Sequence, residues 1–290
     1  MKVVILGSTG LLGQALVRFY KKNCVVICVA RKNSDYNIDV TDDALLIRLI
    51  EEVRPDLLIN CTAIVDIDFC EKNPNKAYML NGRVPAILSN LSLDFGFKFV
   101  QISTDHYYTG NSPVLHKETD TVFLVNEYAR SKYIGECCSL TNKNVLVIRT
   151  NIVGMRNNLL KPTFLEWVID SIYNSASINV FYDMFTSPIH VDHFSEFLDC
   201  LIVKDSCGIY NLSGRDVVSK EDFIIRLLKR MNLSNNLIEV TRSSVLNNGI
   251  ARANSLGLDT SKSEHKIGKF LPSVDDCIEK IVLELNKKGG

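Results

Sequence analysis

The chain has 290 residues, and 46% of them are hydrophobic, which is enough for a sizeable core in one large domain or two smaller ones. Lys and Arg number 33, as do Asp and Glu, so no net positive charge is present to attract nucleic acid or an anionic membrane. The N-terminus lacks the regions of a signal peptide and no apolar run approaches the ~18 residues of a membrane span, so we expect a cytoplasmic protein.

Strand-like and helix-like stretches alternate through the first half of the chain, which predicts an α/β fold with a Rossmann-type, doubly wound parallel sheet. The predicted strands are nearly continuous apolar runs, as expected where helices cover both faces of a sheet: Lys2–Leu6, Val25–Ala30, Leu57–Asn60, Lys98–Ser103 and Val145–Arg149. The helices predicted between them are Leu11–Tyr20, Asp42–Val53, Asn75–Asp94 and Asn126–Leu140.

After Arg149 the alternation loosens into a mixture of helices, short strands and loops. Helices are predicted over Ile189–Ile202, Lys220–Met231 and Val274–Asn286, and a buried strand over Gly208–Leu212. We therefore expect residues 1–150 to form the sheet domain. Residues 151–290 are expected to form a smaller α/β lobe that binds substrate, packs on the sheet edge and returns some segments to the sheet.

The chain has nine cysteines, an odd number, and none of them form a Cys-x-x-Cys motif. Both observations argue against a disulfide framework or a zinc site. Most are expected to be buried thiols that act as small hydrophobic side chains. His190 and His193 could share a metal on a helix, but no third ligand is identifiable, so no metal site is predicted.

A glycine-rich segment, Gly7-Ser8-Thr9-Gly10-Leu11-Leu12-Gly13, follows the first strand and opens the first helix. In this context the glycines permit a tight turn, close approach of the backbone to a pyrophosphate, and close helix–strand packing. The helix N-terminus adds amide donors and a positive dipole. We predict a dinucleotide site at Gly7, Thr9, Gly10, Leu11, Leu12 and Gly13; the alternative is a purely structural turn.

The end of the second strand bears on which dinucleotide is bound. Binders of NAD usually place an acidic residue there. This chain places Arg31 and Lys32 there and has its first acidic residue at Asp35. Two cations suit a 2′-phosphate, so the sequence favours NADPH as the cofactor. The alternatives are NADH as the cofactor, or a solvated basic turn with no role in binding. The next segment resembles a loop in which an aspartate meets the adenine edge, which points to Asp39 and Val40. Asp42 better suits a helix N-cap.

Two further segments lie at strand ends, where sheets of this type bind ligands. The small residues Cys61, Thr62 and Ala63 follow the third strand and would let a nicotinamide ribose approach. Thr104 follows the fourth strand and could hydrogen-bond a substrate carbonyl, whereas Asp105 is expected to anchor its loop. A hydroxyl at a strand end is also a common structural feature.

Tyr128 and Lys132 are four residues apart and share one face of a predicted helix. There the ammonium can stabilise a phenolate and lower the pKa of the phenol from about 10. Such a tyrosine can give a proton to a carbonyl oxygen as hydride reaches the carbon. Alone, this pair is usually ordinary surface, but downstream of a dinucleotide loop it indicates a reductase.

Several motifs occur in one order and together resemble the extended short-chain dehydrogenase/reductases, and within them the dTDP-4-dehydrorhamnose reductase family. They are the glycine loop, Ile38-Asp39-Val40-Thr41-Asp42, Pro55-Asp56 leading to Ile59-Asn60, Ile102-Ser103-Thr104-Asp105, Glu118-Thr119-Asp120 and Tyr128-x-x-Ser131-Lys132. The resemblance is dense over residues 1–154. It continues more thinly through Ser187-Pro188-Ile189-His190-Val191-Asp192, Gly208 to Gly214, and Leu258-Asp259-Thr260-Ser261-Lys262.

The resemblance implies a catalytic set of Thr104, Tyr128 and Lys132 that reduces the 4-keto group of a nucleotide-linked 6-deoxysugar with NADPH. Such a reaction serves the synthesis of surface polysaccharide sugars. Tyr128 and Lys132 would also contact the cofactor, Lys132 through the hydroxyls of the nicotinamide ribose. Thr104 would contact the substrate.

The departures from the family pattern bear on the substrate. His106 stands where the family commonly has tyrosine, and Asn151 follows Arg149-Thr150 where a tryptophan is common nearby. The proline usual upstream of the catalytic tyrosine is also missing. We predict substrate contacts at His106 and Asn151, and at Ser187, which lies in a segment with no obvious structural purpose.

Two other functions remain open. Some relatives of this family are regulatory subunits of other enzymes, so the chain could be a non-catalytic, NADP-binding partner. An epimerase or dehydratase would use the same fold, but dehydratases generally carry an Asp-Glu pair where this chain has Asp105-His106. A nucleotide sugar is the expected substrate, and a homodimer is left open.

Overall fold

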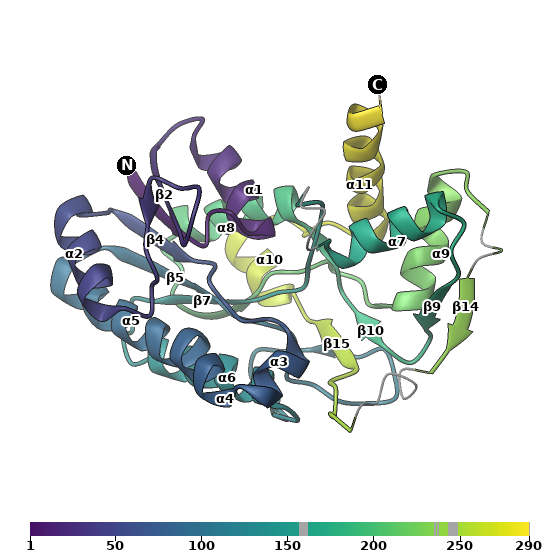
Figure 1. Cartoon of the computed structure of the whole chain (residues 1–290), viewed down its shortest axis with the longest axis horizontal. Coiled ribbons are helices and arrows are strands. Elements are labelled where there is room, and N and C mark those ends of the chain that lie inside the picture. Colours follow the sequence, from purple (N-terminus) through teal and green to yellow (C-terminus); the bar gives the residue numbers. More distant parts are fainter. Residues whose placement is uncertain (157–161, 235, 237, 243–248, 290) are drawn as a thin grey trace. The chain divides into compact units, whose positions relative to one another are not determined.

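The computed structural model describes residues 1–156, 162–234, 236, 238–242 and 249–289, and its Cα positions form two compact units (Figure 1). Unit 1 comprises Met1–Thr104, Leu124–Arg149 and Asp199–Tyr210. Unit 2 comprises Asp105–Phe123, Thr150–Leu198 and Asn211–Gly290. The assignment of residues 1–150 and 151–290 to a cofactor domain and a substrate lobe stays a prediction.

Unit 1 is built on a seven-stranded sheet, and the predicted Rossmann-type fold is confirmed. In spatial order the strands are β12 (Gly208–Asn211), β7 (Leu146–Arg149), β5 (Lys98–Ile102), β4 (Leu57–Asn60), β1 (Lys2–Leu6), β2 (Val25–Ala30) and β3 (Tyr36–Asn37). The five pairings from β7 to β3 are parallel. The strand order reverses beside β1, so the carboxyl ends of β1 and β4 flank the point where such sheets bind ligands.

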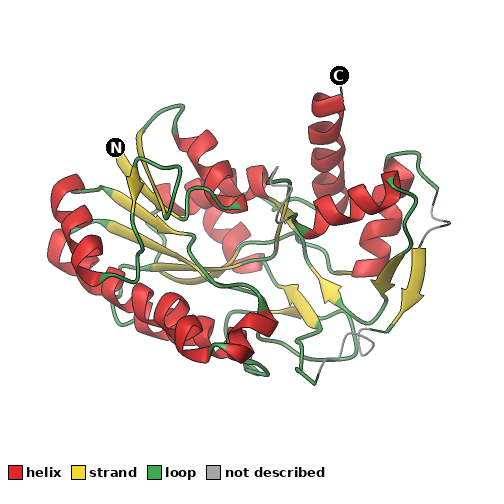
Figure 2. Ribbon diagram, in the orientation of Figure 1, coloured by secondary structure: helices red, strands yellow, loops and turns green. Residues whose placement is uncertain are grey.

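Helices cover both faces of this sheet (Figures 1 and 2). They are α1 (Leu11–Tyr20), α2 (Asp43–Val53), α3 (Ile67–Lys72), α4 (Pro74–Ala77), the π-helix η1 (Tyr78–Arg83), α5 (Val84–Phe95) and α6 (Glu127–Ser139). On one face, apolar residues of α2 and α5 bury alternate strand residues in a single core, among them Leu46, Ile50, Leu88, Val4, Leu58 and Phe99. The Asp42 carboxylate accepts a hydrogen bond from the Leu45 amide, so its predicted role as the N-cap of α2 is confirmed.

The helix predicted over Asn75–Asp94 is wrong in its middle, because the structure has the π-helix η1 there. Asn81, inside η1, is buried and uses its side chain in three hydrogen bonds. Its Oδ1 accepts from the Ile64 amide at 2.8 Å, and its Nδ2 donates to the Ile64 carbonyl and to Ser131 Oγ at 2.9 and 3.0 Å. A π-turn widens the helix locally, and such turns are frequent at functional sites.

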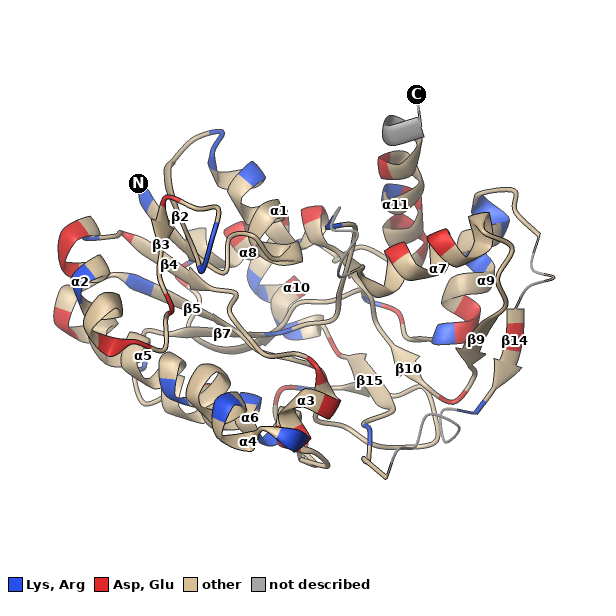
Figure 3. Cartoon of the chain, viewed as in Figure 1, with Lys and Arg blue, Asp and Glu red and all other residues tan. Residues whose placement is uncertain are grey.

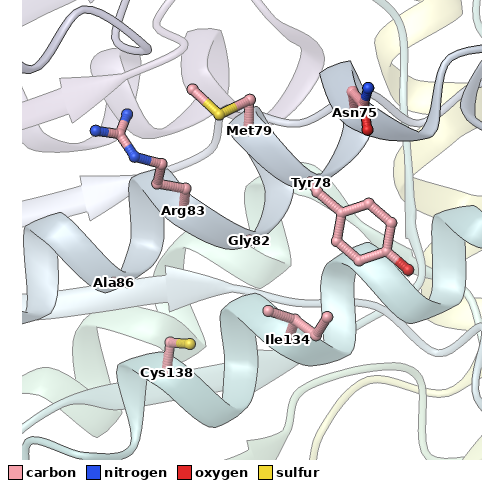
Figure 4. Close-up of a pocket in the computed structure, with 8 residues that line it drawn as sticks. All are labelled: Asn75, Tyr78, Met79, Gly82, Arg83, Ala86, Ile134 and Cys138. Carbon is pink, nitrogen blue, oxygen red and sulfur yellow. The ribbon is translucent and has the colours of Figure 1, made fainter.

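Two glycines let α6 and η1 pack closely. A Cβ atom at Gly135 of α6 would overlap the carbonyl oxygen of Asn81, which is rigid backbone. A Cβ atom at Gly82 of η1 would instead lie 3.2 Å from the Ile134 side chain, which can move. Figure 4 shows Gly82 and Ile134 facing one another across an apolar groove of about 460 Å³ between these helices.

Unit 2 combines short strands with longer helices. Its strands are β6 (Leu115–His116), β10 (Phe185–Thr186), β13 (Val218–Ser219) and β15 (Ser255–Leu258) in one sheet, β8 (Ile152–Val153) with β11 (Ile189–His190), and β9 (Ile178–Phe181) with β14 (Ile238–Thr241). Its helices include α7 (Phe164–Tyr173), α9 (Lys220–Arg230), α10 (Ser261–Ile267) and α11 (Val274–Gly289). Its core lies between α7, α9, α11 and β9, with Val168, Leu227, Cys277 and Val180 as members.

The helix predicted to start at Ile189 starts two residues later, as α8 (Val191–Val203). Ile189 and His190 form β11 instead, because the Ile189 amide donates to the Asn151 carbonyl at 2.9 Å and the strand pairs with β8. Within the described residues, no helix is both long and apolar enough to cross a membrane. All nine cysteines lie in the described part of the chain, and each is a free thiol.

The approach of α6 to η1 gives a testable prediction. Gly135→Ala forces a methyl group against the Asn81 carbonyl, so we expect it to lower the free energy of unfolding by about 1–3 kcal/mol. In the matched variant Gly82→Ala the new methyl group meets only a side chain that can move. Alanine also lowers the backbone entropy of the unfolded state relative to glycine, which offsets about 0.5–1 kcal/mol of any loss of stability. Urea denaturation of both variants measures the difference. Equal stability would contradict the close approach.

Candidate active site

The glycine loop forms a cradle between β1 and α1. Gly7 has a left-handed backbone, with φ +80°, and its amide donates to the Val29 carbonyl at 2.8 Å. A Cβ atom at Gly7 would lie 3.1 Å from the Cys61 carbonyl carbon, and one at Gly13 would overlap the Gly7 carbonyl oxygen. Gly10 is the N-cap of α1 and offers no side chain to its first turn, which leaves those amides for an anionic ligand.

The basic turn after β2 is exposed. Arg31 and Lys32 are both exposed and lie in the loop between β2 and β3; Figure 3 colours the Lys and Arg positions of the chain blue. The Asp35 carboxylate accepts a hydrogen bond from the Cys28 amide at 2.8 Å, so this acid is held on the edge of β2. A shallow hollow of about 420 Å³ adjoins the turn and the glycine loop; its lining includes Thr9, Arg18 and Asn33.

The predicted adenine contacts follow β3. Asp39 is exposed, and its carboxylate accepts hydrogen bonds from the Thr41 amide at 3.0 Å and from Thr41 Oγ1 at 2.7 Å. These two bonds are the main cause of a lowered pKa for Asp39. Val40 is buried in the core beneath α2. The loop is thus ordered by its own hydrogen bonds.

A buried asparagine shapes the segment after β4. Asn60 Oδ1 accepts from the Thr62 amide at 3.1 Å and from Thr62 Oγ1 at 2.6 Å, while its Nδ2 donates to Gln101 Oε1 at 2.8 Å. These bonds fix Cys61, Thr62 and Ala63 at the carboxyl edge of the sheet, next to Gly7. The sequence analysis placed Asn60 in a motif but gave it no role, because an asparagine at a strand end carries no distinctive signal.

The predicted catalytic pair lies on α6, with little exposure to solvent. Asn126 caps this helix by accepting from the Ala129 amide at 2.9 Å. Tyr128 and Lys132 are 7% and 4% exposed, and Lys132 Nζ donates to the Ile102 carbonyl at 2.7 Å. That carbonyl ends β5, two residues before the buried Thr104. The predicted set Thr104, Tyr128 and Lys132 therefore belongs to one unit and one strand–helix contact.

Burial changes the acid–base properties of this site. Desolvation lowers the pKa of Lys132 to about 8, opposed by the charge of Glu136 and by the Cys61 thiol. Burial likewise raises the pKa of Cys61 to about 12, opposed by Lys132. The structure thus brings the predicted cofactor contact Cys61 into the electrostatic environment of Lys132, and the thiol stays protonated at neutral pH.

Two residues behind Lys132 were missed by sequence reasoning. Glu136 is 1% exposed and Arg149 2%, and they form a two-point ion pair in which Arg149 Nε donates to Glu136 Oε2 at 3.1 Å. Ser103 Oγ donates to the same carboxylate oxygen at 2.9 Å. The spacing of Glu136 four residues after Lys132 was the available signal, since it places both on one helix face.

Three of the four predicted substrate residues, His106, Asn151 and Ser187, belong to unit 2, whereas Thr104 ends the first segment of unit 1; the structure brings His106 and Asn151 together. The Asp105 carboxylate accepts from Asn151 Nδ2, and its Oδ1 lies 3.9 Å from His106 Nε2. Burial lowers the pKa of His106, while Asp105 opposes this and Lys220 and Arg252 add to it. Burial also lowers the pKa of Lys220, opposed by Asp105, and its Nζ lies 5.2 Å from the centre of the Phe164 ring.

Ser187 is not part of that group. It is fully buried, and its Oγ donates to Ser213 Oγ at 3.1 Å and accepts from the Leu258 amide at 3.0 Å. Its hydroxyl thus serves the packing of unit 2, and the substrate contact stays a prediction. His190 Nε2 lies 3.1 Å from Glu284 Oε2 of α11. Among the described residues, no His, Cys, Asp or Glu cluster could hold a metal.

The depressed pKa of Lys132 predicts a pH dependence of stability. Between about pH 8 and 10.5 the folded lysine has lost its proton while the unfolded one retains it, so stability rises with pH in this window. Lys132→Met removes this rise, and the parent should gain up to about 3 kcal/mol relative to the variant across the window. Urea titrations at a series of pH values measure it, with exposed Lys143→Met as control. Parallel pH curves for parent and Lys132→Met would contradict a buried ammonium.

Comparison with known proteins identifies relatives along the whole chain. The family model described as the RmlD substrate binding domain matches residues 1–286. A probable low-salt glycan biosynthesis reductase of Haloferax volcanii is 26% identical over 286 residues, which cover 95% of each chain. The methionine adenosyltransferase 2 subunit beta of Xenopus laevis is 26% identical over 286 residues, 93% of this chain and 84% of that protein.

A solved structure shows the same fold. The crystal structure of dTDP-4-dehydrorhamnose reductase from Bacillus anthracis in complex with NADP superposes with a TM-score of 0.88, at 24% identity, and covers 98% of this chain and 99% of that one. The family match extends over nearly the full length, and the resemblance predicted from the motifs is confirmed. The chain belongs to the RmlD substrate binding domain family, that of the dTDP-4-dehydrorhamnose reductases.

Proposed function

We propose that the chain is an NADPH-dependent reductase of the 4-keto group of a nucleotide-linked 6-deoxysugar, used for surface polysaccharide sugars. One observation carries the proposal: Tyr128 and Lys132 are both buried on α6, and Lys132 donates to the carbonyl that ends β5, in the same unit as a glycine loop of the kind that binds dinucleotides. The names of the Haloferax and Bacillus relatives, a glycan biosynthesis reductase and a dTDP-4-dehydrorhamnose reductase, support the same chemistry.

The cofactor is expected to bind at this cradle, because Gly7 and Gly13 let β1, α1 and the segment after β4 pack closely, and Gly10 leaves the first-turn amides of α1 without a side-chain cap. Gly7, Thr9, Gly10, Leu11, Leu12 and Gly13 would hold the pyrophosphate, and Cys61, Thr62 and Ala63 the nicotinamide ribose. Arg31 and Lys32 would hold a 2′-phosphate, and Asp39 and Val40 would face the adenine. When bound, the reduced nicotinamide supplies a hydride to the carbonyl carbon.

Tyr128 then supplies the proton. As the carbonyl carbon gains hydride, its oxygen gains negative charge, and the phenol transfers its proton to that oxygen to complete the alcohol. Lys132 stabilises the phenolate that remains, and Thr104 hydrogen-bonds the same substrate oxygen. Low exposure of Tyr128 and Lys132 strengthens these interactions, because little water screens them.

The residues of unit 2 suit an anionic substrate. The charges of Asp105, Lys220 and Arg252 all act on His106, and those of Asp105 and Arg252 act on Lys220, so a lysine, an arginine and a carboxylate lie near the His106 ring. An excess of positive charge is suited to the phosphates of a nucleotide sugar, to which lysine and arginine donate charge-assisted hydrogen bonds. Asn151 is held on Asp105 and would contribute an amide to the sugar.

A second function has support from one relative. The methionine adenosyltransferase 2 subunit beta belongs by name to another enzyme's assembly, so a non-catalytic, NADP-binding subunit is the rival proposal. The low exposure of Thr104, Tyr128 and Lys132 favours catalysis, because a subunit that only bound a nucleotide would not need this set. A dehydratase or epimerase is less favoured, since Asp105 is followed by a histidine and is engaged by Asn151.

Replacement of the proton donor tests the reductase proposal. We expect Tyr128→Phe to lower the rate of single-turnover NADPH oxidation by about 10²–10⁴-fold with a 4-keto-6-deoxysugar nucleotide, while NADPH affinity changes little. The matched control is Tyr133→Phe on the same helix. A rate within about threefold of the parent would remove Tyr128 from the mechanism. If the parent binds NADPH but reduces no such sugar, the subunit proposal takes precedence.

Replacement of the basic turn tests the cofactor preference. The double variant Arg31→Ala/Lys32→Ala should weaken NADPH binding by about one to two decades, because charge-assisted bonds to phosphate contribute about 1.5–3 kcal/mol. NADH binding should change little. Calorimetric titration of both cofactors measures this, with Lys21→Ala/Lys22→Ala, at exposed lysines of the same unit, as the charge-matched control. Equal losses for NADPH and NADH would contradict the assignment.

A further inference from the structure

A buried ion pair stands directly behind the catalytic lysine. Glu136 of α6 and Arg149 at the end of β7 are almost fully buried and meet through two hydrogen bonds, and Ser103 Oγ donates to the same carboxylate. Buried ion pairs contribute little net stability, because desolvation offsets their attraction, whereas removing one partner alone is strongly destabilising. Stability alone therefore does not account for the buried ion pair of Glu136 and Arg149.

The position of the ion pair connects it to Lys132 on α6 and to the segment after β5 that carries Thr104. Glu136 lies one helical turn after Lys132, on the same face of α6. Ser103, which it holds, lies between Ile102, whose carbonyl accepts from Lys132, and Thr104. The groups that act on the charge of Lys132 are Glu136 on its own helix and Cys61 after β4. Cys61 is a protonated thiol, so Glu136 provides the negative charge.

We propose that Glu136 is a positioning residue for the catalytic site: its carboxylate keeps the buried Lys132 in the ammonium form at neutral pH, and its bond to Ser103 fixes the end of β5. The role in catalysis rests on the proposed reductase function, but the effect on the Lys132 proton does not. Arg149 holds the carboxylate in place through two hydrogen bonds. The pair thus acts through Lys132 and Thr104 without touching substrate.

The electrostatic part explains how a buried lysine retains its charge. Desolvation has already lowered the pKa of Lys132 to about 8, close to neutral pH. An opposite charge nearby typically raises the pKa of a lysine by about 1–3 units, so without Glu136 much of Lys132 would be neutral at pH 7. A neutral amine would not stabilise the phenolate of Tyr128.

Direct titration of Lys132 tests the inference without any substrate. In the double variant Glu136→Gln/Arg149→Met both buried charges are removed together, which avoids an unpaired arginine. Lysine side chains labelled with ¹³C at Cε report their own protonation by NMR, and the signal of Lys132 is assigned by its loss in Lys132→Met. We expect the titration midpoint of Lys132 to fall in the double variant, by less than removal of a lone carboxylate would cause, because loss of the Arg149 charge acts in the opposite direction.

Matched variants separate charge from position. Ser103→Ala removes the bond to β5 but no charge, so the Lys132 midpoint should stay within about 0.3 units of the parent. Glu127→Gln removes a carboxylate from the same helix at its far end and should leave the midpoint unchanged too. Should the double variant not fold, Glu136→Asp keeps the charge but withdraws it by one methylene, and a smaller fall of the midpoint is expected.

The outcomes distinguish this inference from the proposed function. A Lys132 midpoint that does not move in the double variant, or in Glu136→Asp if that is the folded one, would overturn the electrostatic role. If the parent reduces a 4-keto sugar, the basic limb of its pH–rate profile should shift with the midpoint. If the parent reduces none, the reductase proposal fails, while the NMR titration still decides the role of Glu136.

Discussion

The structure of unit 1 depends most on the burial of one ammonium group. Lys132 is removed from water at the contact between α6 and β5, and an isolated charge in such a place would be strongly destabilising. Two features offset this destabilisation: the Ile102 carbonyl accepts a hydrogen bond from the ammonium, and Glu136 supplies an opposite charge nearby. The ends of β5 and β7 and the course of α6 are all arranged around this group.

A second polar connection ties the segment after β4 to the same helix. Asn81 bonds both backbone groups of Ile64 and also Ser131 of α6, whose Oγ donates in turn to the Tyr128 carbonyl at 3.0 Å. The π-turn that carries Asn81 and the absence of a Cβ atom at Gly135 bring these partners together. The segment expected to meet the nicotinamide ribose and the helix expected to supply the proton are therefore parts of one rigid arrangement.

The sequence allowed the fold to be predicted where the signal is local. Apolar runs located the strands of the sheet, and Asp42 marked the start of α2, because strand burial and N-caps leave short-range patterns. The start of α8 and the π-turn at Tyr78–Arg83 could not be predicted in this way. Ile189 forms a strand because its amide finds a backbone partner at Asn151, a contact between distant parts of the chain.

The same distinction holds for the candidate site. The glycine loop and the pair Tyr128 and Lys132 have fixed spacings, so they were predicted, whereas the bonds from Asn81 to Ile64 and Ser131, and from Glu136 to Ser103 and Arg149, join segments that are distant in sequence. Ser187 shows the converse. It was chosen because its segment had no evident structural purpose, and the structure engages its hydroxyl with Ser213 and the Leu258 amide.

The division of the chain has a consequence for how the protein can be taken apart. Five peptide bonds join the units, after residues 104, 123, 149, 198 and 210, so neither unit corresponds to a continuous stretch of the gene. No truncation can release one unit intact, because each unit is assembled from separate stretches of the chain. The first junction follows Thr104 directly. A cut at that junction would therefore separate Thr104, the residue proposed to bond the substrate oxygen, from Asp105 of the other unit.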